Sequence, residues 1–222
     1  MKPIIGVILR PEKIGNYEKM SIYNEIGYAI IKNGGIPISL YPPTLENYYG
    51  KTIDNTKELT SLELETWQKM IDSCAGIICQ GGKDYYDYDL KAIKYAHQLN
   101  KPLLGICLGM QAMAVAFSGK MEKIETSDHC QPRVKEVHGI TIKKSSKLFT
   151  ILKTEKLKVN SRHEWKVVKT DLEIVAWAED GVIEAIEDKS KKFFIGLEWH
   201  PESMIEDERM NNIFKQFILA CK

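Results

Sequence analysis

A single cysteine, Cys107, stands between two glycines in the segment G-I-C-L-G. The apolar run before it, residues 102–106, has the length of a buried strand, and residues 110–117 after it predict a buried helix. This pattern places a thiol at the apex of a sharp strand-to-helix turn, where the flanking glycines let the backbone double back. Because a thiol at a helix N-terminus faces partial positive charge, we expect the reactive thiolate to be favoured. The chemistry indicated is nucleophilic attack by sulfur.

A second motif, W-H-P-E, ends an apolar run near the C-terminus and supplies His200 and Glu202. The proline that follows His200 has a fixed φ, which holds the histidine rigidly at its strand end. Glu202, two residues on, can reach back to the imidazole ring. A cysteine, a histidine and a carboxylate can form a catalytic triad, in which the histidine deprotonates the thiol and the carboxylate orients the ring.

Each of these motifs alone has a plain structural interpretation. A lone cysteine after an apolar strand is usually a small buried hydrophobe, and H-P-E is also a reasonable turn after a strand. The two motifs occur together in one chain, and this coincidence favours catalysis.

The composition is that of an ordinary globular chain. Its 222 residues are 44% hydrophobic and 27% charged, enough for one domain with a large core. The net charge of +1 gives no electrostatic footprint for nucleic acid, and the longest apolar runs are too short to span a membrane. The N-terminus does not resemble a signal peptide. Five scattered cysteines predict reduced thiols and a cytoplasmic location.

The first 120 residues predict four alternations of strand and helix. We expect residues 10–20 and 48–60 to form loops. Alternation of this kind is typical of an α/β fold with a doubly wound, mostly parallel sheet flanked by helices. Such sheets bind ligands at the carboxyl ends of their strands, where Cys107 and the pair Gly81-Gly82 fall. The expected strands are 3–9, 36–40, 75–79 and 102–106, and the expected helices are 21–32, 61–72, 84–99 and 110–117.

The pattern changes after Gly119, where strand-like segments follow one another without long helices. This indicates a small antiparallel section before the C-terminal strand, at 193–199, and a final helix that starts near Glu206. The motif E-D-G between the last two segments of the section is a hairpin signal. The segments are 133–142, 157–160, 173–178 and 182–187.

Three features together resemble class I glutamine amidotransferase-like proteins: G-I-C-L-G-M-Q, the Gly81-Gly82 turn after a strand, and the C-terminal W-H-P-E. Further segments resemble the γ-glutamyl-γ-aminobutyrate hydrolases of the branch called peptidase family C26. These are K-P-I-I-G-V, G-G-I-P-I-S-L-Y-P, V-N-S-R-H and D-G-V-I-E-A-I-E. The resemblance covers nearly the whole chain. It implies one class I glutamine amidotransferase-like domain over residues 1–222, with a flavodoxin-like sheet.

The resemblance also implies a role for each site residue. Cys107 would be the nucleophile, His200 the base and Glu202 the orienting acid. The backbone N–H groups of Gly82 and Leu108 would form the oxyanion hole, which stabilises the oxygen of the tetrahedral intermediate.

Four further side chains would bind the substrate. Gln111, one helical turn past the nucleophile, would hydrogen-bond the glutamyl head. Asn160, Ser161 and His163 would line the glutamyl pocket from the antiparallel section. For His163 the alternative is an ordinary surface histidine.

The function implied is hydrolysis of a γ-glutamyl amide through a γ-glutamyl thioester on Cys107, with release of glutamate and an amine. The alternative is a glutaminase subunit that supplies ammonia to a separate synthase. Leu108 favours the subunit, because many γ-aminobutyrate hydrolases carry arginine there, whereas V-N-S-R-H and D-G-V-I-E-A-I-E favour the hydrolase. A non-catalytic regulatory relative is the third alternative, and the intact triad argues against it. The expected partner is a small-molecule γ-glutamyl substrate, and the sequence leaves open a homodimer or a synthase partner.

No cofactor is expected, because the sequence has neither a P-loop nor a dinucleotide-binding fingerprint. His129, Cys130 and His138 raise the question of a metal. No C-x-x-C or H-x-x-x-H spacing supports one, so the sequence predicts no metal site.

Overall fold

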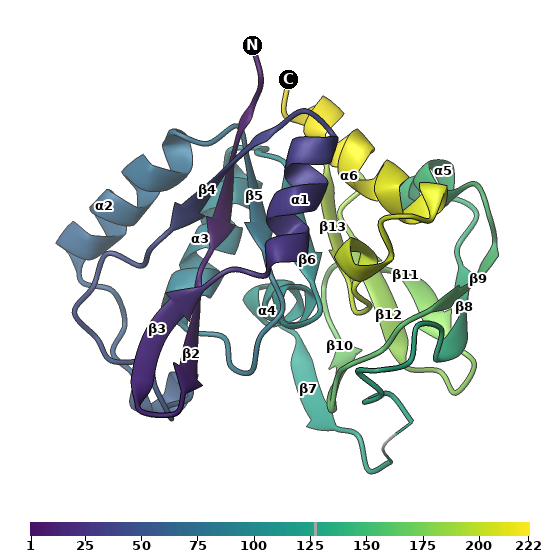
Figure 1. Cartoon of the computed structure of the whole chain (residues 1–222), viewed down its shortest axis with the longest axis horizontal. Coiled ribbons are helices and arrows are strands. Elements are labelled where there is room, and N and C mark those ends of the chain that lie inside the picture. Colours follow the sequence, from purple (N-terminus) through teal and green to yellow (C-terminus); the bar gives the residue numbers. More distant parts are fainter. Residues whose placement is uncertain (127) are drawn as a thin grey trace.

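The structure is a computed structural model that describes residues 1–126 and 128–222. A nine-stranded sheet runs through the molecule in the order β4-β1-β5-β6-β13-β12-β11-β8-β9 (Figure 1). The first five strands in this order pair in parallel and the last four pair antiparallel. The parallel strands are β4 (Ile36–Leu40), β1 (Ile4–Ile8), β5 (Gly76–Cys79), β6 (Leu103–Ile106) and β13 (Phe194–Leu197). The others are β12 (Ile183–Glu187), β11 (Glu173–Ala178), β8 (His138–Ile142) and β9 (Lys156–Val159).

Helices cover both faces of this sheet. On one face α1 (Asn24–Lys32), α5 (Lys147–Leu152) and α6 (Glu208–Ala220) pack into one apolar core. On the other face α2 (Ser61–Asp72), α3 (Asp87–Gln98) and α4 (Leu108–Ala116) pack into a second core. The predicted α/β fold, with its doubly wound sheet and its antiparallel section before the C-terminal strand, is therefore confirmed.

The strands next to the predicted nucleophile are fully buried. Every residue of β5, β6 and β13 is buried, as expected for parallel strands with helices on both sides. Eight of the nine residues of α4 are buried as well. The N- and C-termini lie together at one end of the molecule (Figure 1), and the carboxyl ends of the parallel strands point the other way.

One segment differs clearly from its prediction. Residues 10–20, expected to form a loop, fold as a hairpin of β2 (Arg10–Ile14) and β3 (Tyr17–Ser21), with Gly15 at a φ of 59° in the turn. Most residues of the two strands are exposed, so they lack the alternating apolar pattern of a half-buried strand. The two-residue Gly-Asn turn was the available signal.

The sequence also missed shorter elements. β7 (Lys120–Lys123) pairs with β10 (Trp165–Lys169), and α5 follows β8. Two short 3-10 helices, η1 (Ile53–Asn55) and η2 (Pro201–Met204), lie within the expected loop 48–60 and after β13. The last helix is expected to start near Glu206; η2 ends before that point, and α6 begins at Glu208, where the side chain of Asp207 caps it.

Two further observations concern the whole described chain. All five cysteines carry free thiols. Across residues 1–126 and 128–222, none of the helices has the combined length and apolar character that crossing a bilayer requires.

Candidate active site

Cys107 lies at the strand-to-helix turn that the sequence predicts. It is the N-cap residue of α4, with φ of 51° and ψ of −110°, a backbone conformation that non-glycine residues rarely adopt. Strained conformations of this kind persist where the surrounding structure enforces them, often at functional sites. Here the turn separates the fully buried β6 from the buried α4 and leaves the thiol at the carboxyl end of the sheet.

The two glycines that flank Cys107 are required for close packing. A Cβ atom on Gly109 would lie 1.9 Å from the carbonyl oxygen of Cys79 on β5. A Cβ atom on Gly105 would lie 2.8 Å from the carbonyl carbon of Gly109. The first turn of α4 therefore sits directly against β5 at Gly109 and against β6 at Gly105, and a side chain at either position would block this approach.

His200 and Glu202 form the predicted pair. The Nδ1 atom of His200 lies 2.7 Å from Oε1 of Glu202, and both residues are buried. Glycine at position 81 makes room for the ring, because a Cβ atom there would lie 3.0 Å from Cε1 of His200 and 3.7 Å from Cβ of Cys107. The side chain of Cys107 and the ring of His200, which Glu202 holds, therefore both lie next to Gly81.

Gly82 lies beside the side chain of Leu108. A Cβ atom on Gly82 would come within 3.0 Å of both the Leu108 side chain and Arg10. Arg10 holds the Gly81-Gly82 turn in place, because its guanidinium donates two hydrogen bonds to the carbonyl oxygen of Gln80 at 3.2 and 3.0 Å. The same guanidinium is held by Asp89 at 2.5 Å.

The thiol opens into a cleft of about 770 Å³. One wall is the β2–β3 hairpin together with the start of α1. The opposite wall is the segment around residues 162–165 together with Cys130. Gly82, Cys107 and Gln111 lie between these walls, so the cleft is positioned to hold a small molecule against the sulfur.

The environment of the thiol corrects one expectation. Burial raises the pKa of Cys107 well above its ordinary value of 9.0, and the nearby carboxylates of Glu198 and Glu202 raise it further. The N–H group of Leu108 at the helix N-terminus lowers the pKa, but it does not outweigh these effects. The resting sulfur is therefore a thiol at neutral pH, and its attack requires a base.

The four predicted substrate residues fall in different environments. Gln111 lines the cleft, and its Nε2 donates to Oε1 of Glu198 at 2.5 Å. Asn160 is buried and binds the backbone of His200, while Ser161 is buried and donates to the carbonyl oxygen of His129 at 2.6 Å. His163 reaches the cleft wall but is only 4% exposed, so it is not the surface histidine of the alternative interpretation.

A buried group of ionisable residues adjoins the site, and the sequence did not predict it. Burial raises the pKa of Glu198 to about 8, against the lowering effect of His163. Burial lowers the pKa of His163, but Glu198 and Glu184 outweigh it and raise the value to about 9. His129 and His138 also lie beside Glu184, whose Oε1 is 3.5 Å from Nδ1 of His129 and 3.4 Å from Nε2 of His138. Short motifs such as C-x-x-C and H-x-x-x-H could not reveal this group, because its members come from four separate segments of the chain.

One sequence signal could have revealed the group. Every residue of β12 is buried, although the strand I-E-A-I-E carries two carboxylates. Glu187 caps α5 by accepting from the N–H groups of Lys147 and Leu148 at 2.9 and 3.1 Å. Among the described residues, Glu184 makes no hydrogen bond through either oxygen. A charge inside a fully buried strand demands a partner, which for Glu184 must come from elsewhere in the chain.

Comparison with known proteins agrees with this geometry. The sequence profile of Peptidase C26 matches residues 3–202. A glutamine amidotransferase-like protein of Rickettsia prowazekii is 29% identical over 298 aligned positions, which cover 100% of this chain and 98% of that protein. A glutamine-hydrolysing GMP synthase of Francisella philomiragia is 34% identical over 151 residues, 66% of this chain but only 28% of the longer synthase.

Solved structures share the fold at low sequence identity. A GMP synthase subunit of Thermoplasma acidophilum has a TM-score of 0.68 at 16% identity and covers 100% of this chain and 95% of its own. The glutaminase domain of CTPS from Trypanosoma brucei has a TM-score of 0.67 at 17% identity, with coverage of 99% and 94%. From the profile match over residues 3–202, the relatives and the cysteine turn, we conclude that the chain belongs to the peptidase C26 family of class I glutamine amidotransferase-like proteins.

Proposed function

We propose that this chain is a cysteine-dependent hydrolase that cleaves the γ-glutamyl amide bond of a small conjugate and releases glutamate and an amine. The observation that carries the proposal is the position of Cys107, at a strained turn beside the His200–Glu202 pair and open to the cleft. Residues 1–222 would form one catalytic domain. The free cysteines fit action in the cytoplasm.

The reaction would run through two acyl transfers. His200 takes the proton of the Cys107 thiol as the sulfur attacks the γ-carbonyl carbon. The N–H groups of Gly82 and Leu108 stabilise the resulting oxyanion. The C–N bond then breaks, and the His200 proton goes to the leaving amine. Water, deprotonated by His200, attacks the thioester, and the thiol and glutamate are released.

The raised pKa of Cys107 gives His200 a definite task in this scheme. A thiol that stays protonated at neutral pH reacts only if its proton is removed as the bond forms. Glu202 supports the transfer, because its 2.7 Å contact fixes the ring and stabilises the imidazolium that forms.

We propose that the enzyme selects the γ-glutamyl head strictly and the amine loosely. The head carries an ammonium and a carboxylate, and burying them without partners is costly. Gln111 and His163 are the predicted binding residues that line the cleft, whereas Asn160 and Ser161 are buried behind its wall and would act through the residues they contact. The amine would lie along the β2–β3 hairpin, where the cleft extends beyond the space around Cys107.

A glutaminase subunit is the second candidate function. The 34% identity with the Francisella GMP synthase favours it, as does Leu108 in place of the arginine expected of many hydrolases. The amidotransferase would use the same acyl-enzyme, but its leaving group would be ammonia passed to a synthase partner.

One assay separates the two functions. Release of the amine, or of ammonia from glutamine, is measured for glutamine, for γ-glutamyl amides of several amines, and for the glutaryl amide of one of those amines. The hydrolase should turn over several γ-glutamyl amides, and kcat/KM for the glutaryl amide should be lower by about a hundredfold or more. Cys107→Ser is the inactive control. Turnover of glutamine alone would favour the glutaminase, and equal turnover of the glutaryl amide would contradict selection of the head.

A further inference from the structure

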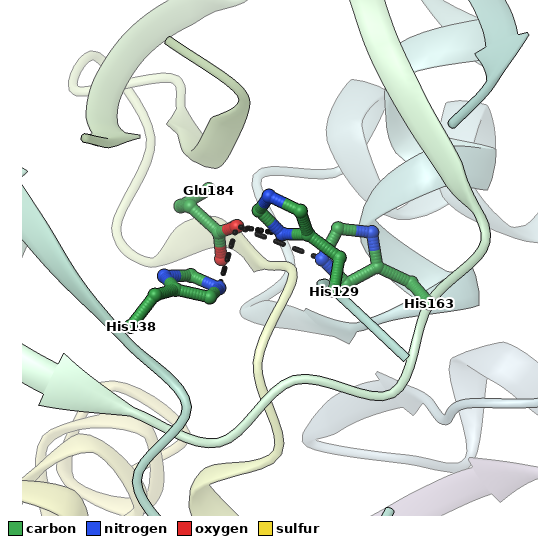
Figure 2. A group of neighbouring side chains, drawn as sticks. All are labelled: His129, His138, His163 and Glu184. Carbon is green, nitrogen blue, oxygen red and sulfur yellow. Dashed lines mark ion pairs between the residues drawn. The ribbon is translucent and has the colours of Figure 1, made fainter. Parts of the chain in front are cut away.

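Three histidine rings and one carboxylate converge inside the antiparallel section. Figure 2 shows His129, His138 and His163 directed at the carboxylate of Glu184. Oε1 of Glu184 lies 3.5 Å from Nδ1 of His129, 3.4 Å from Nε2 of His138 and 3.6 Å from Nε2 of His163. One potential ligand atom from each residue lies within 4.8 Å of all the others.

These four groups do not satisfy one another by hydrogen bonding. A hydrogen bond from nitrogen to oxygen spans about 2.7–3.2 Å, shorter than any of the three separations. Within the described part of the chain, the inner nitrogens of all three rings and both oxygens of Glu184 are buried without a hydrogen-bond partner. Buried polar atoms almost always have partners, so the unpartnered atoms that these four residues direct at one another require an explanation.

The outer nitrogens of two of the rings, in contrast, have good partners. Nδ1 of His163 lies 2.9 Å from the carbonyl oxygen of Trp165, and Nε2 of His129 lies 2.9 Å from a carboxylate oxygen of Asp180. A carbonyl oxygen only accepts, so Nδ1 of His163 carries a hydrogen, and a metal that displaces the proton of Nε2 would meet the lone pair of that nitrogen at the centre. His138 has a longer outer contact, 3.5 Å to the carbonyl oxygen of Gly139. This arrangement of outer partners is typical of metal-binding histidines.

We propose that His129, His138, His163 and Glu184 bind a zinc ion. Three imidazole nitrogens and one carboxylate oxygen are a donor set that Zn²⁺ accepts in tetrahedral geometry. With bonds of about 2.0–2.1 Å, the ligand atoms of a tetrahedral zinc site are roughly 3.3 Å apart. The separations of 3.4–3.6 Å from Glu184 need to contract by only a few tenths of an ångström.

The zinc would be structural, because four protein ligands leave no open position for a reactant. His129 and His163 lie in the two segments that carry Cys130 and Arg162, both of which line the cleft. An isolated β-bridge between Cys130 and Arg162 pairs these segments, with backbone hydrogen bonds of 3.0 Å from the N–H of His163 to the carbonyl oxygen of His129 and from the N–H of Gln131 to that of Ser161. The metal would tie both to Glu184 on the sheet and so hold one wall of the cleft opposite the β2–β3 hairpin. This inference does not depend on which γ-glutamyl substrate the enzyme uses.

The first test measures metal binding by the full-length protein. Chelator-treated protein is titrated with Zn²⁺ in a calorimeter, and a parallel sample is loaded with Co²⁺ for visible spectroscopy. We expect one Zn²⁺ per chain and a Co²⁺ spectrum of four-coordinate type without a thiolate charge-transfer band. Absence of stoichiometric binding would overturn the proposal and leave the group as a proton-sharing His–Glu network.

The second test uses variants with a matched control. His138→Gln removes one ligand and should abolish stoichiometric binding. Asp180→Asn alters only the outer partner of His129 and should weaken binding by about tenfold to a hundredfold. His97→Gln is the control, because His97 also pairs with an aspartate, at 2.8 Å from Asp188, but lies outside the group. It should bind zinc as the wild type does.

Cys107→Ser distinguishes this site from the reactive thiol, and it should retain full zinc binding. Loss of binding in Cys107→Ser, or full binding in folded His138→Gln, would assign the metal elsewhere and overturn the proposal. If His138→Gln does not fold, the affinity of Asp180→Asn and the wild-type Co²⁺ spectrum decide the question.

Discussion

The side-chain amide of Asn160 holds the backbone of His200 from both sides. Oδ1 of Asn160 accepts from the N–H group of His200 at 2.8 Å, and Nδ2 donates to its carbonyl oxygen at 2.9 Å. Both residues are buried. A residue of the antiparallel section therefore sets the position of the proposed catalytic base, which itself follows the last strand of the parallel sheet.

Asn160→Ala should lower kcat by about a hundredfold and leave KM nearly unchanged, because a misplaced base slows proton transfer without removing a substrate contact. Steady-state kinetics provide the check. Asn33→Ala is the matched control, because Asn33 also makes two side-chain hydrogen bonds, to Ala29 and Asn211 at the end of α1. An equal loss of kcat in both variants would show a general effect on stability instead.

His200 and Glu202 should behave as one unit. His200→Ala removes the base and should lower kcat by about a thousandfold or more. Glu202→Gln keeps a side chain near Nδ1 and should be the milder change. The double variant should be little worse than His200→Ala alone, because Glu202 acts only through the ring it contacts at 2.7 Å. Losses that add in log kcat would argue against a shared role.

Gly81→Ala should displace the imidazole. The added methyl group would lie 3.0 Å from Cε1 of His200, so the ring must shift by a few tenths of an ångström. We expect kcat to fall by about tenfold or more while the protein still folds. Gly27→Ala, in α1 with no described atom within 4 Å of the new methyl group, should keep full activity and gain about 0.5–1 kcal/mol of stability. If Gly81→Ala kept the wild-type kcat, the imidazole of His200 in this position would not be the catalytic base.

The raised pKa of Cys107 predicts how alkylation depends on pH. A thiol with a raised pKa stays protonated to higher pH, so its reactive thiolate fraction grows with pH up to and beyond 9.0. In His200→Ala, alkylation of Cys107 by iodoacetamide should therefore keep accelerating past pH 9.0. Site-resolved mass spectrometry separates this labelling from that of Cys130, which also lines the cleft. If the alkylation rate of Cys107 reached a plateau well below pH 9.0, the helix N-terminus would lower the pKa of the thiol by more than burial raises it.

The sequence predicts the parallel half of the fold and the contact between His200 and Glu202 well, because both depend on local patterns. Strands β5, β6 and β13 are buried on both faces. Their sequences are therefore continuous apolar runs, which are easy to recognise, and not an alternation of apolar and polar residues. Cys107 is flanked by glycines because α4 packs closely against Cys79. The five consecutive residues G-I-C-L-G are therefore enough to predict the turn. His200 and Glu202 are two residues apart, so their contact is nearly local.

The features that the sequence did not predict depend on distant contacts or exposed strands. The β2–β3 hairpin is mostly exposed, so its residues carry no burial pattern. His129, His138, His163 and Glu184 come together only after four segments of the antiparallel section have folded around one point. The pKa of Cys107 was expected to fall because the helix N-terminus is visible in the sequence, whereas burial and the carboxylate of Glu198 are not.

The most direct test of the proposed function is the covalent state of Cys107 during turnover. The enzyme is mixed with a γ-glutamyl amide, quenched in acid within a few turnovers, and digested for mass spectrometry. The account predicts a γ-glutamyl group on the peptide that contains Cys107, removable by hydroxylamine as γ-glutamyl hydroxamate, and no adduct or turnover in Cys107→Ser. Glutamate release at the full rate with Cys107 unmodified, or more than about a tenth of that rate in Cys107→Ser, would contradict it.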